Sequence, residues 1–219
     1  VTIFSGVGLS MLIAAPIGAA ASQVGTLIMW ATEQAPLVMG ILVSVIVGVA
    51  LTLPISSAAI CAALGLTGLA GGAAVAGCCA QMIGFAVMSY KENGVGGLVS
   101  QGLGTSMLQM GNIVKNPRIW IAPTLASAIT GPLATCVFHF EMNGAAVSSG
   151  MGTCGLVGQI GVYTGWVSDI AAGVKTAITP MDWAAMVLLC FVLPAVLSVI
   201  FCEIERKMGW IKEGDLKLN

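Results

Sequence analysis

The chain has 219 residues, of which 58% are hydrophobic and 8% are charged, and its formal net charge is −1. An ordinary soluble domain carries roughly 25% charged residues, and a soluble helix needs a polar face. The composition therefore excludes most soluble folds, and the near-neutral charge argues against a nucleic-acid partner. Because helices satisfy their own backbone polar groups in lipid, we predict an all-α polytopic membrane protein.

We expect residues 1–219 to form a single transmembrane domain. The chain begins with Val1 inside an apolar segment, which predicts that it is the C-terminal part of a longer chain. The first apolar stretch, about Val7 to Trp30, contains Pro16. It is either a kinked span or the end of a broken helix followed by a span.

The stretch from Gln34 to Tyr90 contains 57 consecutive uncharged residues. Two spans of a ~30 Å hydrocarbon core use about 40 residues. We assign spans to residues 36–53 and 69–90. The remainder, residues 54–68, begins with a proline, ends near glycines and holds two adjacent serines. It predicts a short re-entrant helix, which is tolerated only against protein or a watery cavity.

Residues 91–118 form the first polar region. Apolar side chains recur there every three or four residues, namely Val95, Val99, Leu103, Met107, Met110 and Val114. The pattern predicts a cytoplasmic amphipathic helix in the membrane interface, although six glycines weaken a helix. A helix in a soluble loop is the alternative.

Three further segments follow. Residues 119–138 are apolar but contain Pro123 and Pro132, residues 144–166 are rich in glycine and hydroxyl groups, and residues 183–202 read as a span kinked at Pro194. The polar residues 203–219 form a tail.

Basic residues give the orientation. Residues 91–118 hold three of them and the tail holds four, whereas the loop 167–182 holds only Lys175. The positive-inside rule places the first two regions in the cytoplasm and the loop outside. The chain must then cross the membrane an odd number of times between Arg118 and Ser168. One apolar segment there is a full span and the other a returning hairpin, for which we favour 119–138.

Two short internal matches hint at a duplicated layout. Residues 57–60 resemble residues 126–129, and residues 72–75 match residues 144–147. Duplicated discontinuous segments often mark a transporter's binding site, but short matches arise easily in a chain so rich in glycine and alanine.

Glu141 is the first candidate for binding a substrate, together with His139 and Asn143. Ionisable groups at membrane depth are costly and usually functional. A carboxylate accepts hydrogen bonds from sugar hydroxyls, and an amide both donates and accepts them. An ordinary solvated loop is the alternative reading.

A second group of candidates consists of hydroxyl and amide side chains in apolar surroundings. Small residues and hydroxyls let a backbone approach a ligand closely and bind it, although glycines also serve helix packing. The two glutamines within predicted spans have two equal interpretations: they line a pathway, or they form hydrogen bonds between helices. The candidates are Ser148, Ser149, Thr153, Gln159, Gln81, Ser56 and Ser57.

Soluble-type catalysis has no support in the sequence. We find no phosphate-binding loop, nucleophile elbow or zinc pattern. His139 is the only histidine, and the seven cysteines stand mostly in apolar runs without a C-x-x-C pair, as expected of buried thiols. We expect no metal, no cofactor and no enzymatic activity.

The stretch 116–135, continued by Phe140-Glu-Met-Asn143 and by the glycine-rich residues 150–161, resembles the membrane enzyme IIC-like family of the bacterial sugar phosphotransferase system, which includes perfringolysin regulatory protein-like members. The resemblance implies a bacterial cell-membrane protein with re-entrant hairpins, usually a dimer, that binds a sugar at hairpin tips, often through a glutamate. Glu141 is the matching residue, and a partner subunit carries the phosphate.

Two functional hypotheses follow. In the first, the chain is a sugar permease in which segments near Pro54 and Pro123, Glu141 and residues 148–153 form a substrate site that works by alternating access. In the second, it is a membrane-bound sensor or regulator of toxin or virulence gene expression without transport activity, as the resemblance to regulatory members implies.

Overall fold

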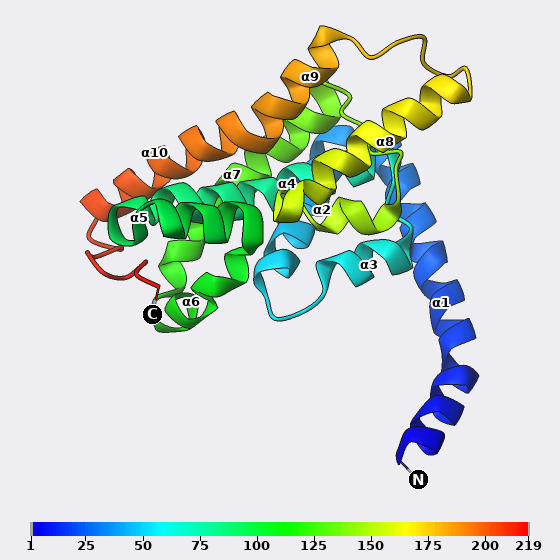
Figure 1. Cartoon of the computed structure of the whole chain (residues 1–219), viewed down its shortest axis with the longest axis horizontal. Coiled ribbons are helices and arrows are strands. Elements are labelled where there is room, and N and C mark those ends of the chain that lie inside the picture. Colours follow the sequence, from blue (N-terminus) through cyan, green and yellow to red (C-terminus); the bar gives the residue numbers. More distant parts are fainter. Residues whose placement is uncertain (1, 219) are drawn as a thin grey trace.

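The computed structural model describes the backbone of residues 2–218 and the side chains of residues 18–218. Within these residues the chain is helical, and its only β contact is an isolated antiparallel bridge between Gly68 and Met142. The all-α prediction is therefore confirmed. The α-helices in Figure 1 are α1 (Thr2–Gln34), α2 (Pro36–Thr52), α3 (Ser57–Leu64), α4 (Gly68–Met88), α5 (Tyr90–Val99), α6 (Met110–Lys115), α7 (Ile121–Pro132), α8 (Val157–Ala171), α9 (Pro180–Val187) and α10 (Leu193–Lys207).

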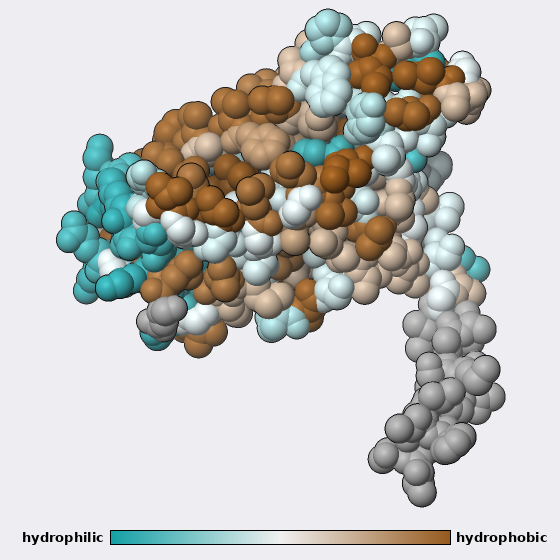
Figure 2. Space-filling model, viewed as in Figure 1, coloured by the Kyte–Doolittle hydropathy of each residue, from teal (hydrophilic) through white to brown (hydrophobic). Residues whose placement is uncertain are grey.

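Three continuous helical segments in the described part of the chain are long and apolar enough to cross a membrane. They are Gly68–Met88, Pro117–Val137 and Pro180–Lys207, and Pro36–Thr52 is a shorter apolar helix. Figure 2 shows apolar residues along α10 and across the middle of the visible face, with hydrophilic residues gathered at the end near the C-terminus. The helices expected at 36–53, 69–90 and 183–202 are confirmed.

Helix α4 lies at the centre of the molecule because its side chains are small. It is rich in glycine, alanine and cysteine, and each of the three hydrophobic clusters contains part of it. Small residues let helix backbones approach closely. At Gly77 the backbone of Ser44 in α2 occupies the place that a Cβ atom would take, so a larger residue there would push α2 away.

Contacts along α4 define two ends of the molecule. α2 runs in the same direction as α4, since Cys78 Sγ contacts the Val47 carbonyl and Thr52 bonds to Gln81. α7 runs the opposite way, because the Thr135 hydroxyl near its end donates to the Pro36 carbonyl at the start of α2. We call the end with Pro36, Gly68 and His139 the cleft end, and the end with Met88 and residues 208–218 the tail end.

Residues 138–171 fold back on themselves as a hairpin, whereas residues 119–138, which we had favoured for the returning hairpin, do not; insertion of a hairpin into the membrane stays a prediction. The two arms of the hairpin 138–171 meet at the cleft end, where Asn143 Nδ2 donates to Asp169 Oδ2 at 2.9 Å. Its tip reaches about halfway along α4, where Gly152 packs against Cys78. Residues 117–137 instead form one continuous helix.

The prolines of 117–137 explain why that segment does not fold back. Pro123 stands in the first turn of α7, directly after the 3₁₀ turn Pro117–Trp120, and proline is tolerated in the first turn of an α-helix. Pro132 is followed by the π-helical turn Leu133–Val137, which takes up the disturbance without ending the helix. Pro194 instead follows a π-helical turn, Leu188–Val192, and stands in the first turn of α10, where proline is tolerated.

Residues 36–68 also leave the cleft end and return to it, through α2 and the short helix α3. The expected short helix within 54–68 is confirmed as a helix, and its insertion into a membrane stays a prediction. Gly65 ends α3 in the left-handed conformation at φ 63°, which glycine adopts without strain. α3 packs against the turn Ala146–Gly150 of the other hairpin.

The polar region 91–118 is not the single helix that we predicted. It consists of α5, a π-helical turn (Ser100–Gly104), a 3₁₀ turn (Ser106–Gln109), α6 and a second 3₁₀ turn (Pro117–Trp120). α5 itself breaks at Gly94, whose φ of 59° and ψ of −154° lie outside the helical region. The glycines decide the outcome, since they remove the penalty for such breaks. An interfacial location stays a prediction.

The two short internal matches do not correspond to equivalent structures. Residues 57–60 lie in α3 and residues 126–129 in α7, whereas residues 72–75 lie in α4 and residues 144–147 in a loop and a 3₁₀ turn. The matches therefore reflect the glycine- and alanine-rich composition.

Candidate functional site

A cleft of about 280 Å³ opens at the cleft end between three segments. The first segment follows α7, the second is the last part of α8, and the third is the loop before α9 together with the start of α9. The cleft is lined by Phe138, His139, Phe140, Glu141, Trp166, Asp169, Val174, Lys175, Met181, Asp182 and Ala185. Five of these side chains are ionisable, in a chain that is 8% charged.

Two carboxylates of the cleft share one amide donor. Asn143 Nδ2 donates to Glu141 Oε2 at 3.1 Å and to Asp169 Oδ2 at 2.9 Å. Neither carboxylate is within ion-pair distance of a basic side chain among residues 18–218. Each carboxylate has further oxygen lone pairs that can accept hydrogen bonds from a ligand.

His139 holds its place at the rim through an unusual backbone. Its φ is 44°, a region that non-glycine residues rarely adopt. The backbone on either side is fixed, because Phe138 N–H donates to the Leu133 carbonyl and Phe140 N–H to the Ala134 carbonyl. Backbone strain held in this way is common at binding sites.

Lys175 and Asp182 form the opposite wall. Lys175 Nζ lies 2.7 Å from Asp182 Oδ1 and 5.3 Å from the centre of the Trp166 ring. Asp182 also caps α9, since its carboxylate accepts from the Thr179 N–H while Thr179 Oγ1 accepts from the Asp182 N–H. The capping box fixes the carboxylate and thereby the lysine.

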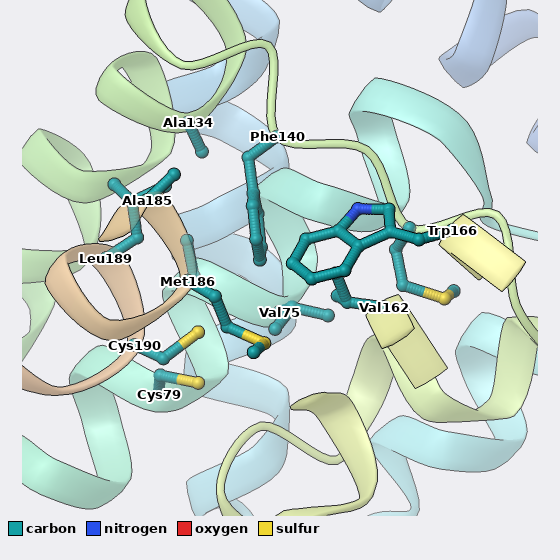
Figure 3. Close-up of a cluster of buried hydrophobic side chains, with 12 residues drawn as sticks. Val75, Cys79, Ala134, Phe140, Val162, Trp166, Ala185, Met186, Leu189 and Cys190 are labelled. Atoms are coloured by element: carbon teal, nitrogen blue, oxygen red, sulfur yellow. The ribbon is translucent and has the colours of Figure 1, made fainter. Parts of the chain in front are cut away.

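The floor of the cleft is apolar. Figure 3 shows the Phe140 ring standing between Trp166 on one side and Ala185, Met186 and Leu189 on the other. Trp166 packs edge to face on Trp183 with ring centres 5.6 Å apart. The cleft thus combines carboxylates and an ammonium group at its rim with aromatic surface below.

The structure brings together three of the residues that we singled out from the sequence. His139 and Glu141 are exposed and line the cleft, and Asn143 bridges the carboxylates beside it. These side chains come from one loop, so their proximity follows from their neighbourhood in the chain.

The predicted hydroxyl residues lie elsewhere, and three of them join elements to one another. Ser57 Oγ donates to the Gly150 carbonyl at 2.7 Å, Ser149 Oγ to the Leu66 carbonyl at 2.7 Å, and Thr153 Oγ1 to the Gly102 carbonyl at 2.5 Å. Ser148 is buried against α8 near Gly161, and exposed Ser56 caps α3 by accepting from the Ala59 N–H. In this conformation the three buried donors are already satisfied.

The two glutamines differ in how fully they are bonded. Gln81 is fully buried and bonds to Trp120 Nε1, Thr52 Oγ1 and Thr124 Oγ1. Gln159 Nε2 contacts Cys79 Sγ at 3.2 Å, but its Oε1 is buried without a partner. Gln159 lies seven residues before Trp166 on the same side of α8, so an unsatisfied acceptor lies beneath the apolar floor of the cleft.

Sequence reasoning missed the second half of the cleft, namely Trp166, Asp169, Lys175 and Asp182. We used the loop 167–182 only to decide the orientation. A signal was present, because the loop places three charged residues close to Trp166 and Trp183 in a chain where charge is rare. What the sequence does not give is the return of the hairpin, which brings Asp169 beside Asn143.

No curated protein and no solved structure matches the chain. The chain does match the family described as "Phosphotransferase system, EIIC", over residues 1–218. Members of this family are membrane sugar-transport components of bacteria and are not themselves catalytic. With its apolar helices and a match over nearly its whole length, the chain belongs to the phosphotransferase system EIIC family.

Proposed function

We propose that the chain binds a sugar or a similar polar solute in the cleft and carries it across the membrane by alternating access. The observation that carries the proposal is the shared amide donor of Glu141 and Asp169. It fixes two carboxylates side by side and leaves both without a basic partner among the described residues.

Sugar chemistry fits this arrangement. Sugar hydroxyls leaving water need replacement hydrogen bonds, and carboxylates are strong acceptors for them. Phe140 and Trp166 line the cleft but are only 3% and 5% exposed, so they supply an apolar floor beneath a bound sugar. Pockets for drug-sized ligands span about 300–1,000 Å³, so a cleft of about 280 Å³ suits one sugar ring better than an oligosaccharide.

The buried hydroxyl and amide groups belong to a later stage of the proposed cycle. Ser57, Ser149 and Thr153 join the hairpins 36–68 and 138–171 to each other and to residue 102. Movement of these hairpins would free donors along the path and uncover Gln159. Ser56, Ser148 and Gln81 adjoin the same surfaces, and broken helices of this kind line transport paths in other transporters.

The charge distribution supports an orientation with the cleft end outside. Lys91 and Arg206 lie at the tail end with residues 208–218, whereas the cleft holds one lysine among three carboxylates. Residues 203–219 would then be cytoplasmic, where phosphotransferase partner subunits phosphorylate the sugar. We further propose that lipid covers the exposed apolar side chains of α10 and that the protein is a homodimer.

Glu141→Gln tests the site. We expect at least about tenfold weaker sugar binding, as for loss of a charged hydrogen bond worth about 1.4 kcal/mol or more. Binding of a panel of radiolabelled hexoses and hexitols to the purified protein in detergent measures it. Glu33→Gln is the matched control, because Glu33 is an exposed glutamate outside the cleft. Equal binding by both variants would remove Glu141 from the site.

Transport needs its own measurement. Vesicles that contain the protein and its phosphotransferase partner subunits are expected to take up a sugar that the purified protein binds. Binding without uptake would contradict the permease function and leave a ligand-sensing role.

A further inference from the structure

The segment that follows α10 is docked along the tail end as a series of turns, in which the Asp215 N–H donates to the Lys212 carbonyl and the Lys217 N–H to the Gly214 carbonyl. We call residues 210–218 the strap and residues 89–116 the platform. Five hydrogen bonds join the side-chain amides of the platform to backbone atoms of the strap. They are Asn93 Nδ2 to the Leu216 carbonyl (2.8 Å), Gln109 Nε2 to the same carbonyl (3.0 Å), Asn112 Nδ2 to the Lys217 carbonyl (3.0 Å), Asn116 Nδ2 to the Trp210 carbonyl (2.9 Å) and Asn93 Oδ1 from the Leu218 N–H (2.8 Å).

Two apolar side chains anchor the strap. Leu216 is fully buried and Ile211 is 3% exposed, and both belong to the cluster that contains Phe85 and Ile113. The neighbouring Lys212 and Lys217 are exposed. The strap is therefore held by platform amides that bond to its backbone and by two buried apolar side chains five residues apart.

The amides of the platform form one buried network. Gln109 Nε2 also donates to Gln101 Oε1 at 2.9 Å, Asn112 Nδ2 donates to Gln109 Oε1 at 2.7 Å, and Gln101 Nε2 donates to Ser89 Oγ at 2.7 Å. Gln101 and Gln109 are fully buried. Removing the strap would expose the network to water. Gln109 and Asn112 would each lose one backbone carbonyl acceptor, so the ordered structure of the platform depends on the docked strap and the reverse.

The platform also holds the tip of the hairpin 138–171. The π-helical turn Ser100–Gly104 contains both Gln101 of the network and Gly102, whose carbonyl accepts from Thr153 Oγ1 at 2.5 Å. Gly102 packs on Ala86 and Ile83 of α4. The strap is therefore separated from the hairpin tip by one network of buried hydrogen bonds and a single turn of backbone.

We infer that the platform is a peptide-docking site whose occupant is the strap of the same chain, and that docking of the strap holds the tip of the hairpin 138–171 in place. The base of this hairpin carries Glu141, Trp166 and Asp169 of the cleft. Any event at the tail end that lifts the strap then loosens a hairpin whose other end lies at the cleft. The inference depends only on the contacts between strap, platform and tip, so it stands whether or not the cleft binds sugar.

Hydrogen–deuterium exchange of the full chain in detergent tests the inference. Leu216→Ser removes the buried anchor, and Lys217→Ser makes the matched change at an exposed neighbour. We expect Leu216→Ser to speed amide exchange in the strap, in the platform and at residues 150–156 by at least about tenfold. Lys217→Ser should leave residues 150–156 as in the parent protein, and α2 should be unchanged in both variants.

Two further variants keep the test decisive. Asn93→Ala removes two strap contacts at a half-buried position and should give the same pattern more weakly, even if Leu216→Ser does not fold. Thr153→Val cuts the bond to Gly102 and should make exchange at 150–156 insensitive to Asn93→Ala.

Faster exchange in the strap and platform with no change at 150–156 in Asn93→Ala would overturn the link to the hairpin. An unchanged platform in both Leu216→Ser and Asn93→Ala would overturn the docking site itself.

Discussion

The cleft end and the tail end use the same polar side chains in opposite ways. At the tail end Gln101, Gln109 and Asn112 are buried, and their amides bond to one another and to backbone. At the cleft end a single half-buried amide, Asn143, bridges two carboxylates that keep free lone pairs. The difference teaches that amide content alone does not locate a binding site. Both carboxylate oxygens of Glu205 at the tail end also lack a partner, but Glu205 is buried; what distinguishes the cleft is that its free acceptors are open to solvent.

The largest effect that separates the two ends should come from deleting their amides. Gln109→Ala removes three hydrogen bonds from a fully buried network and leaves partners unsatisfied, so we expect a loss of about 3–4 kcal/mol of stability. Asn143→Ala leaves its carboxylates in contact with water and should cost less than about 1 kcal/mol. Thermal unfolding of both variants in detergent measures the difference, and similar losses in the two would contradict the comparison.

The ion pairs sharpen the comparison at an intermediate scale. The side chains of Arg206 and Glu92 are 14% and 10% exposed, those of Lys175 and Asp182 are 25% and 23%, and those of Lys91 and Glu203 are 68% and 46%. Removing one partner of a buried pair strands the other charge, whereas exposed pairs contribute about 0–1 kcal/mol.

We therefore expect Arg206→Met to lower the free energy of unfolding by about 2–3 kcal/mol, Lys175→Met to lower it by less, and Lys91→Met to lower it by under about 1 kcal/mol. Unfolding curves at low and high salt provide the measurement. Only the Lys91 effect should vanish in high salt, because screening acts on exposed charges. If the three losses of stability do not follow the burial of the pairs, burial does not determine how much each pair contributes.

The smallest change in stability is expected for Asp169→Asn. The amide keeps the shape of the side chain at the rim, so the free energy of unfolding should stay within about 0.5 kcal/mol of the parent's value. Sugar binding should nevertheless weaken about as much as in Glu141→Gln, because one of two paired acceptors is replaced. Equilibrium binding measured beside thermal unfolding separates the two effects, and intact binding would remove Asp169 from the site.

The fold class and the positions of the longest helices could be predicted from the sequence because long uncharged runs have one stable solution in lipid. Glu141, His139 and Asn143 could be singled out as candidates because polar groups in such a chain are conspicuous, and their role in binding stays a prediction. The hairpin could not be assigned from prolines alone. Pro123 falls where a helix tolerates proline, and Pro132 is absorbed by a π-helical turn, so neither outcome is visible in the local sequence.

The platform and half of the cleft were missed for a related reason. Both depend on contacts between distant segments, such as Asn93 with Leu216 and Asn143 with Asp169. Periodicity describes one helix at a time. It predicted one amphipathic helix at 91–118 because it does not show that Gln101 and Gln109 turn inward and that Gln109 bonds to Leu216, more than a hundred residues later.

The burial of α4 on all sides has a consequence for biogenesis. A helix built from glycine, alanine and cysteine gains little from lipid on its own, since its small side chains offer little apolar area. The segment 180–207 is more apolar and has much of its surface outside the core. We expect α4 to be only weakly retained in the membrane when it leaves the translocon, so that its stable insertion is completed only after the segment 180–207 has been synthesised.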